Sequence, residues 1–137
     1  MTTLFSQFSL SPALLARIEA NKFVTPTPVQ SGAIPPALEG RDVLATAQTG
    51  TGKTLSFLIP IVEMLQKTEG RSAQALILLP TRELAMQVEQ AFRAIRSSSA
   101  QNVALVVGGL SEGSQLDAIR RGARLIVATP GRLEDFF

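Results

Sequence analysis

Short apolar runs that alternate with helical patterns are the feature that most constrains this fold. Each run is continuously apolar, as in parallel strands that are covered on both faces. Between the runs, apolar side chains recur at helical spacing, as in residues 84–95. Strands and helices in alternation predict an α/β domain with a mostly parallel sheet. The four predicted strands are Asp42–Thr46, Ala75–Leu79, Val103–Val107 and Leu125–Ala128.

Start signals stand before most of the helical patterns. Ser and Thr are good N-caps, and proline suits the first helical position. Glycine is preferred just after a helix end, a place that Gly122 takes. The predicted helices run from Ser11-Pro12 to about Asn21, from Thr27-Pro28 to before Gly40, over Leu55–Leu65, after Thr81 through Leu84, Val88, Phe92 and Ile95, after Ser111 through Leu116 and Ile119, and from Thr129-Pro130 onward.

Composition excludes several kinds of chemistry. The chain has 137 residues, 45% of them hydrophobic, which is enough for one soluble globular domain with its own core. It has no Cys and no His, so structural zinc, thiolate nucleophiles and Ser-His-Asp triads are excluded. A net charge of +2 does not by itself predict a nucleic-acid partner. From Arg71 onward every basic residue is Arg, which suits bidentate contacts to oxyanions, although an ordinary solvated surface is the alternative.

Nothing in the sequence predicts a membrane association. The N-terminal residues lack the basic region and apolar stretch of a secretory signal, and no run of 18 apolar residues occurs. We therefore expect a cytoplasmic protein without a membrane partner.

A glycine-rich loop lies between the first predicted strand and the helix over Leu55–Leu65. Strand, loop and helix in this order are the context that a phosphate-binding P-loop requires. Glycines let backbone N–H groups turn inward around an anion, and the start of a helix adds positive partial charge. Lys53 is expected to reach the β- and γ-phosphates and the Thr54 hydroxyl to bind Mg²⁺, so these two are the expected catalytic residues. An ordinary Gly-rich turn is the alternative. The loop comprises Ala47, Gln48, Thr49, Gly50, Thr51, Gly52, Lys53 and Thr54, with Ala47 where the usual pattern has its first Gly.

A segment before this loop runs Phe23-Val-Thr-Pro-Thr-Pro-Val-Gln30, and Phe5 stands 17 residues before Lys22. The segment is similar to the Q motif of the DEAD-box ATP-dependent RNA helicases, which also have an isolated aromatic at the place of Phe5. The resemblance implies that Gln30 reads adenine and that Phe23 packs on the base. A single amide both donates and accepts, which suits the adenine edge. Taken alone, Gln30 would be an ordinary helix residue. Lys22 departs from the family, which commonly has Gly there.

Three segments after the later predicted strands resemble other motifs of this family. The resemblance implies that they hold the sugar-phosphate backbone of RNA, without preference for a base. The ends of parallel strands are also where ligands bind in open α/β sheets. Helix caps at the two threonines and a plain turn at the glycine pair are the alternatives. The expected RNA-binding residues are Pro80, Thr81 and Arg82, similar to motif Ia; Gly108 and Gly109, similar to the GG motif; and Thr129, Pro130, Gly131 and Arg132, similar to motif Ib.

The resemblance implies a three-layer RecA-like P-loop NTPase fold with a mostly parallel sheet, truncated before the strand that would end in Asp-Glu-Ala-Asp. On this interpretation residues 1–137 are a partial RecA-like helicase ATP-binding domain. Residues 1–31 form its Q-motif region, and residues 32–137 form the P-loop core with motifs I, Ia, GG and Ib.

The resemblance further implies a parent protein that uses ATP/ADP with Mg²⁺ and couples ATP hydrolysis to RNA binding and duplex unwinding. This chain is expected to bind adenine nucleotide but to be inactive alone, because the acidic strand and the second RecA-like domain are missing. An open sheet edge would favour a homo-oligomer. Two alternatives stay open: another P-loop nucleotide-binding protein, and a non-catalytic RNA-binding module.

Overall fold

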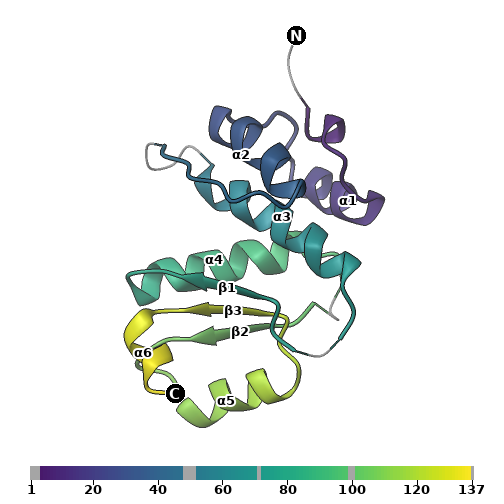
Figure 1. Ribbon diagram of the computed structural model, residues 1–137. Coiled ribbons are helices and arrows are strands. Elements are labelled where there is room, and N and C mark those ends of the chain that lie inside the picture. Colours follow the sequence, from purple (N-terminus) through teal and green to yellow (C-terminus); the bar gives the residue numbers. More distant parts are fainter. Residues whose placement is uncertain (1–3, 48–51, 71, 99–100, 137) are drawn as a thin grey trace. The chain divides into compact units, whose positions relative to one another are not determined.

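The computed structural model describes residues 4–47, 52–70, 72–98 and 101–136. The chain divides into two compact units: an N-terminal unit of Met1–Lys67 with Ala94–Ser97, and a C-terminal unit of Thr68–Arg93 with Ser98–Phe137. Helices make up the first unit, and the second contains the sheet (Figure 1). The elements are η1 (Phe5–Gln7), α1 (Pro12–Ala20), α2 (Pro28–Leu38), α3 (Lys53–Lys67), β1 (Ala75–Leu78), α4 (Arg82–Ile95), β2 (Val103–Val106), α5 (Glu112–Arg120), β3 (Leu125–Ala128) and α6 (Pro130–Glu134).

Helices begin at the predicted caps. The Ser11 hydroxyl accepts a hydrogen bond from the Leu14 N–H at 3.4 Å at the start of α1, and the Ser111 hydroxyl makes the equivalent bond at α5. At α2 the cap is reciprocal: the Gln30 N–H donates to Thr27 Oγ1 at 3.5 Å, and the Thr27 N–H donates to Gln30 Oε1 at 2.8 Å. Such caps satisfy N–H groups that the helix itself leaves unpaired.

The end of α1 explains the departure at Lys22. The Lys22 N–H donates to the Glu19 carbonyl at 2.9 Å, and the Phe23 N–H donates to the Ile18 carbonyl at 3.2 Å. This pair of bonds is the Schellman ending of a helix, which requires a left-handed residue where Lys22 lies. Lys22 has φ +64°, a conformation that glycine adopts without steric cost. The backbone therefore keeps the shape that glycine favours although the residue is lysine.

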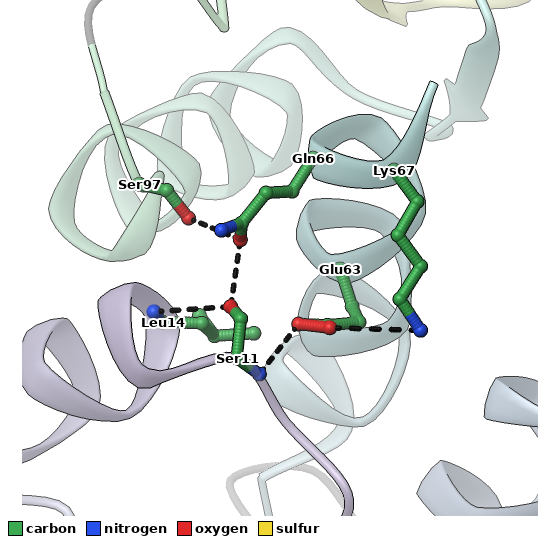
Figure 2. Close-up of polar contacts among 6 residues, drawn as sticks. All are labelled: Ser11, Leu14, Glu63, Gln66, Lys67 and Ser97. Atoms are coloured by element: carbon green, nitrogen blue, oxygen red, sulfur yellow. Dashed lines mark hydrogen bonds and ion pairs between the residues drawn. The ribbon is translucent and has the colours of Figure 1, made fainter.

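Polar contacts tie the start of α1 to the last turns of α3 (Figure 2). Glu63 is 3% exposed, accepts a hydrogen bond from the Ser11 N–H at 2.9 Å, and lies 3.9 Å from the ammonium of Lys67. The hydroxyls of Ser11 and Ser97 both donate to Gln66 Oε1, at 2.7 and 3.0 Å. A buried carboxylate is stable only when it is well bonded, so these contacts fix α1 against α3.

The core of the N-terminal unit comes from one side of each helix. α3 confirms the predicted buried helix and continues through Pro60. A fully buried Leu or Ile side chain contributes about 1.5–3 kcal/mol. The side chains of this unit that are no more than 2% exposed are Leu14, Ile18, Ile34, Leu58, Ile59, Val62, Leu65 and Ile95.

The sheet of the C-terminal unit is parallel, with strand order β1-β3-β2. Ala75 of β1 and Val103 of β2 are both in register with Leu125 of β3. The three strands therefore end at the same edge, where the loops after them begin. This sheet confirms three of the four predicted strands and the α/β class.

One face of this sheet is only partly covered. Ala104 and Val106 of β2 form a buried cluster with Ala128 of β3. Ala118 of α5 and Leu133 of α6 pack against this cluster. The register places Leu76 and Leu78 on the same face, at the β1 edge. Their exposed fractions are 50% and 51%, so cover by α5 and α6 does not extend to β1.

The prediction of the first strand, Asp42–Thr46, is wrong. The structure has no strand there, and Leu44 is 97% exposed. Within the described residues, the backbone of this segment makes no hydrogen bond. A strand needs a neighbouring backbone for its N–H and C=O groups, and a local apolar pattern does not supply that neighbour.

The buried row of α4 also differs by one position from the predicted row. Leu84 is 41% exposed, and Ala85 takes its place among the buried side chains. Ala85, Val88, Phe92 and Ile95 then follow one another at intervals of three or four residues.

Candidate nucleotide and RNA-binding sites

Gln30 joins the start of α2 to the start of α3. Its side chain is 3% exposed. Its Oε1 accepts a hydrogen bond from the Thr27 N–H, and its Nε2 donates one to the Gly52 carbonyl at 3.1 Å. A Gln amide has two N–H donors and two lone pairs on oxygen, so one donor and one acceptor position remain. Gln30 therefore has a structural role: it takes part in the cap of α2 and bonds to Gly52, the residue before α3.

Gly52 needs to be glycine in this arrangement. It has φ +88°, and a Cβ there would lie 2.8 Å from Thr27 Oγ1 and closer still to Gln30 Nε2. Real side chains do not approach so closely, and they rarely adopt this backbone conformation. The end of the predicted P-loop is therefore in direct contact with the Q-motif segment.

Lys53 and Thr54 form the first turn of α3. Lys53 is exposed and Thr54 is half-buried, while the Ser56 hydroxyl donates to the Lys53 carbonyl. A cation at the start of a 15-residue helix fits a phosphate. Half-buried Ala47 precedes the loop. Four predicted loop residues, Gln48, Thr49, Gly50 and Thr51, lie outside the described residues.

The two predicted aromatics differ in exposure. Phe5 is 3% exposed, and its ring meets that of Phe8 edge to face with centroids 6.0 Å apart. Phe23 is 39% exposed and follows the end of α1. Phe23 is therefore exposed enough to pack against a base, whereas Phe5 is a buried core residue.

A cavity of about 470 Å³ also lies in the N-terminal unit. Its described lining is apolar apart from Arg41, Lys53 and Ser56, and includes neither Gln30 nor Phe23. A base bound in it would not be read by Gln30. The apolar part of the lining consists of Val29, Ala33, Ala37, Val43, Ala45, Phe57, Pro60 and Ile61.

The predicted RNA-binding residues of the C-terminal unit all follow the carboxyl ends of its strands. After β1, Pro80 and Thr81 are exposed, and the Thr81 hydroxyl accepts a hydrogen bond from the Leu84 N–H at 3.2 Å. After β3, half-buried Thr129 donates its N–H to the Val106 carbonyl at 3.1 Å. Thr81 caps α4 with its side chain, whereas Thr129 opens α6 without such a bond. Pro130 and Gly131, which follow Thr129, are exposed.

The glycine pair after β2 lies against Arg82. Gly108 and Gly109 are exposed, and Gly109 has φ +82°. A Cβ on Gly109 would overlap Nη1 of Arg82. The structure therefore brings the predicted motif Ia and GG residues together at one edge of the sheet.

Arg132 reaches the same loop from α6. Its Nη2 donates to the Leu110 carbonyl at 2.9 Å, its Nε donates to Gln115 Oε1 at 3.2 Å, and its guanidinium lies 5.6 Å from the centroid of the Phe136 ring. Two arginines, Arg82 and Arg132, thus contact the loop at residues 109–110. Clustered guanidinium groups favour a phosphate-bearing ligand.

Gln115 is a buried polar residue that is not among the predicted site residues. It is 5% exposed and is the buried residue of α5, where the predicted apolar positions Leu116 and Ile119 are only half-buried. A signal was present, because Gln115, Ala118, Ile119 and Gly122 recur at helical spacing. A polar residue in such a row requires partners inside the protein.

No helix of the described chain is long and apolar enough to cross a membrane. Within the described ranges, no three acidic side chains are grouped so that they could hold a metal ion.

The structure defines the class of protein first: an α/β protein with a parallel sheet, in which the predicted phosphate-binding residues Lys53 and Thr54 begin a helix. Residues 27–137 match the DEAD/DEAH box helicase family, and the chain belongs to that family.

Similar proteins agree with this membership. The chain is 46% identical to "ATP-dependent rRNA helicase RRP3" of Meyerozyma guilliermondii, over 96% of this chain and 27% of that protein. It is also 46% identical to "DEAD-box ATP-dependent RNA helicase CshA" of Streptococcus pneumoniae, over 96% of this chain and 25% of that protein. A crystal structure of a DEAD box protein from Methanococcus jannaschii matches with a TM-score of 0.90 at 35% identity, covering 98% of this chain and 37% of that one. The chain thus spans about a quarter of the length of these curated relatives.

Proposed function

We propose that this chain is the ATP-binding part of an ATP-dependent RNA helicase. In this proposal the N-terminal unit binds adenine nucleotide with Mg²⁺, and the C-terminal unit binds the RNA backbone. The observation that carries the nucleotide half is the hydrogen bond from Gln30 to Gly52, which joins the Q-motif segment to the phosphate loop. Family membership and the names of the relatives support both halves.

The residues present fit a nucleotide. Lys53 is exposed at the start of α3, Gly52 has the left-handed backbone of a tight phosphate loop, and Phe23 is free to pack on a base. Gln30 keeps one donor and one acceptor position for adenine beside its contacts within the protein. Thr54 would supply a hydroxyl to Mg²⁺. The bound ion supplies charge stabilisation for phosphoryl transfer.

Calorimetric titration with ADP and with GDP in Mg²⁺ buffer tests the nucleotide half, since a chain without Trp or Tyr gives little intrinsic fluorescence. We expect heat from ADP and none from GDP. Lys53→Ala should abolish the heat, whereas Lys67→Ala, at the exposed far end of α3, should leave it unchanged. Gln30→Glu keeps an acceptor for the Thr27 N–H but loses the donor, so it should weaken ADP binding. Equal heats from ADP and GDP would reduce Gln30 to its structural role, and no heat from either would refute the nucleotide half.

The RNA half rests on the cluster at the carboxyl edge of the sheet. Arg82 and Arg132 contact one loop there, and Thr81, Gly108, Gly109 and Pro130 are close along the chain to the same strand ends. Such groups contact phosphates and sugars and leave the bases unread. We expect the chain to bind single-stranded RNA of different sequences with similar affinity, and to lose affinity as salt rises. Binding that depended on sequence but not on salt would contradict this.

We expect no family-like ATP hydrolysis by these 137 residues alone. The tetrapeptide Asp-Glu-Ala-Asp does not occur in them, and phosphoryl transfer depends on well-placed charges around the metal. A phosphate-release assay with and without RNA measures this. RNA-stimulated turnover by the purified chain would show that the expectation is wrong.

A further inference from the structure

Gln115 connects three segments of the C-terminal unit through one buried amide. Its Nε2 donates to the Val107 carbonyl at 2.8 Å, just after β2, and its Oε1 accepts from Nε of Arg132 at 3.2 Å. Gln115 itself lies on α5 and is 5% exposed. Inside the protein such a hydrogen bond is strengthened, and losing either partner is costly.

Only one orientation of this amide satisfies its neighbours. Val107 offers a carbonyl, which can only accept, and the Arg132 guanidinium has donors only. Turning the amide over would set donor against donor and acceptor against acceptor. The bond to the Val107 carbonyl therefore keeps the amide oxygen of Gln115 toward Arg132. Because this carbonyl belongs to the backbone, it cannot move aside as a side chain could.

The contacts of Arg132 use one edge of its guanidinium. Nε bonds to Gln115 and Nη2 to the Leu110 carbonyl, and these two nitrogens form the side edge of the planar group. The Phe136 ring lies 5.6 Å away and restricts the group further. Among the described residues, Nη1 makes no hydrogen bond. The end edge, made by Nη1 and the second N–H of Nη2, is the edge that remains for a bidentate phosphate.

We propose that Gln115 is a positioning residue for RNA binding, which holds Arg132 with its end edge available to a phosphate and leaves its charge intact. This inference rests on the proposed RNA-binding function. The residue type matters because glutamate, of nearly the same shape, would form an ion pair with Arg132 and could not donate to Val107. A neutral amide orients the guanidinium without neutralising the charge that attracts RNA.

The first test measures the orientation of Arg132 without RNA. In a ¹⁵N NMR spectrum the Nε–H signal of Arg132, identified by its loss in Arg132→Lys, should exchange slowly with water. Gln115→Met removes the acceptor, and the exchange rate should rise about fivefold, as expected for the loss of one hydrogen bond. Gln115→Glu keeps an acceptor, so slow exchange should persist. Unchanged exchange in Gln115→Met, with the fold intact by circular dichroism, would overturn the positioning role.

The second test measures affinity for fluorescein-labelled oligo(U) RNA by anisotropy across a salt series. Gln115→Glu should weaken binding by about five- to tenfold and lower the salt slope by about 0.7, the value for one phosphate contact on a single strand. Gln90→Glu is the matched control, because it adds the same charge at an exposed position of α4 in the same unit. In an Arg132→Ala background, Gln115→Glu should have no further effect on binding. An equal loss in that background, or an equal loss in Gln90→Glu, would overturn the proposal.

The two tests separate this inference from the proposed function. If the unaltered chain fails to bind oligo(U), the RNA-binding function is refuted, and the exchange measurement alone decides whether Gln115 orients Arg132. If the chain binds RNA but Gln115→Met and Gln115→Glu bind as the unaltered chain does, the function stands and the positioning role is refuted.

Discussion

Gly52→Ala is the substitution that most directly tests how the N-terminal unit is built. Gly52 has φ +88°, and a Cβ there would lie 2.8 Å from Thr27 Oγ1. Holding alanine in a left-handed conformation costs about 1–2 kcal/mol. Displacing the Gln30 amide from the Gly52 carbonyl costs about 0.5–1.5 kcal/mol more. Alanine also reduces the freedom of the unfolded chain, which offsets about 0.4–1 kcal/mol.

We therefore expect Gly52→Ala to lower the free energy of unfolding by about 0.5–3 kcal/mol. For a chain of this size the melting temperature should fall by roughly 2–12 °C. Urea unfolding followed by far-ultraviolet circular dichroism measures the free energy, and a thermal scan measures the shift. ADP binding should be lost in the same variant, because the substitution also moves Gly52 at the end of the predicted phosphate loop, directly before Lys53.

Gly32→Ala is the matched control in the same unit. Gly32 lies within α2, and a Cβ there would meet nothing within 4 Å. Alanine at such a helical position should stabilise the chain by about 0.5–1 kcal/mol. The two identical substitutions should thus have opposite signs. A Gly52→Ala chain as stable as the unaltered chain would refute the reasoning, because neither the close approach nor the backbone conformation would then matter.

Three other predictions follow from the structure. Lys22→Gly should stabilise the chain by about 0.5–1 kcal/mol in urea unfolding, because φ +64° strains lysine; a loss of stability would contradict the Schellman ending. Glu63→Leu should destabilise by about 1–3 kcal/mol by leaving the Ser11 N–H unpaired, whereas Glu63→Gln should cost clearly less; equal losses would argue against that bond. Leu76→Lys with Leu78→Lys should reduce any self-association through the β1 edge, measured by light scattering over a concentration series; an unchanged mass that still rises with concentration would place the contact elsewhere.

Local hydrogen-bonding demands explain why much of the fold could be predicted. Ser11, Thr27 and Ser111 lie within three residues of the N–H groups that they cap, so the cap is encoded in a short stretch of chain. The same holds for the helix periodicity of α3 and for three of the four apolar strands. Gly52 is predicted as a phosphate-loop residue from its place in the motif, and this role stays a prediction; the structure gives it φ +88°.

Contacts between distant segments could not be predicted in the same way. Asp42–Thr46 has the pattern of a strand but no partner backbone, so its apolar side chains are exposed. Leu76 and Leu78 lie in an apolar run that predicts a strand covered on both faces. The two side chains are nevertheless half exposed, because α5 and α6 do not cover β1. An apolar pattern indicates that a residue is suited to burial. Whether the residue is buried depends on which other segment of the chain packs against it.

The polar groups of the candidate nucleotide and RNA-binding sites show the same contrast between local and long-range contacts. The sequence by itself determined the α/β class, the caps and the motif segments, because these depend on residues a few positions apart. Only the tertiary structure decided that Gln30 donates to the Gly52 carbonyl, that Arg82 lies against Gly109 and that buried Gln115 accepts a hydrogen bond from Arg132. A donor and an acceptor from distant parts of the chain become partners only once the fold has excluded water and left each without an alternative.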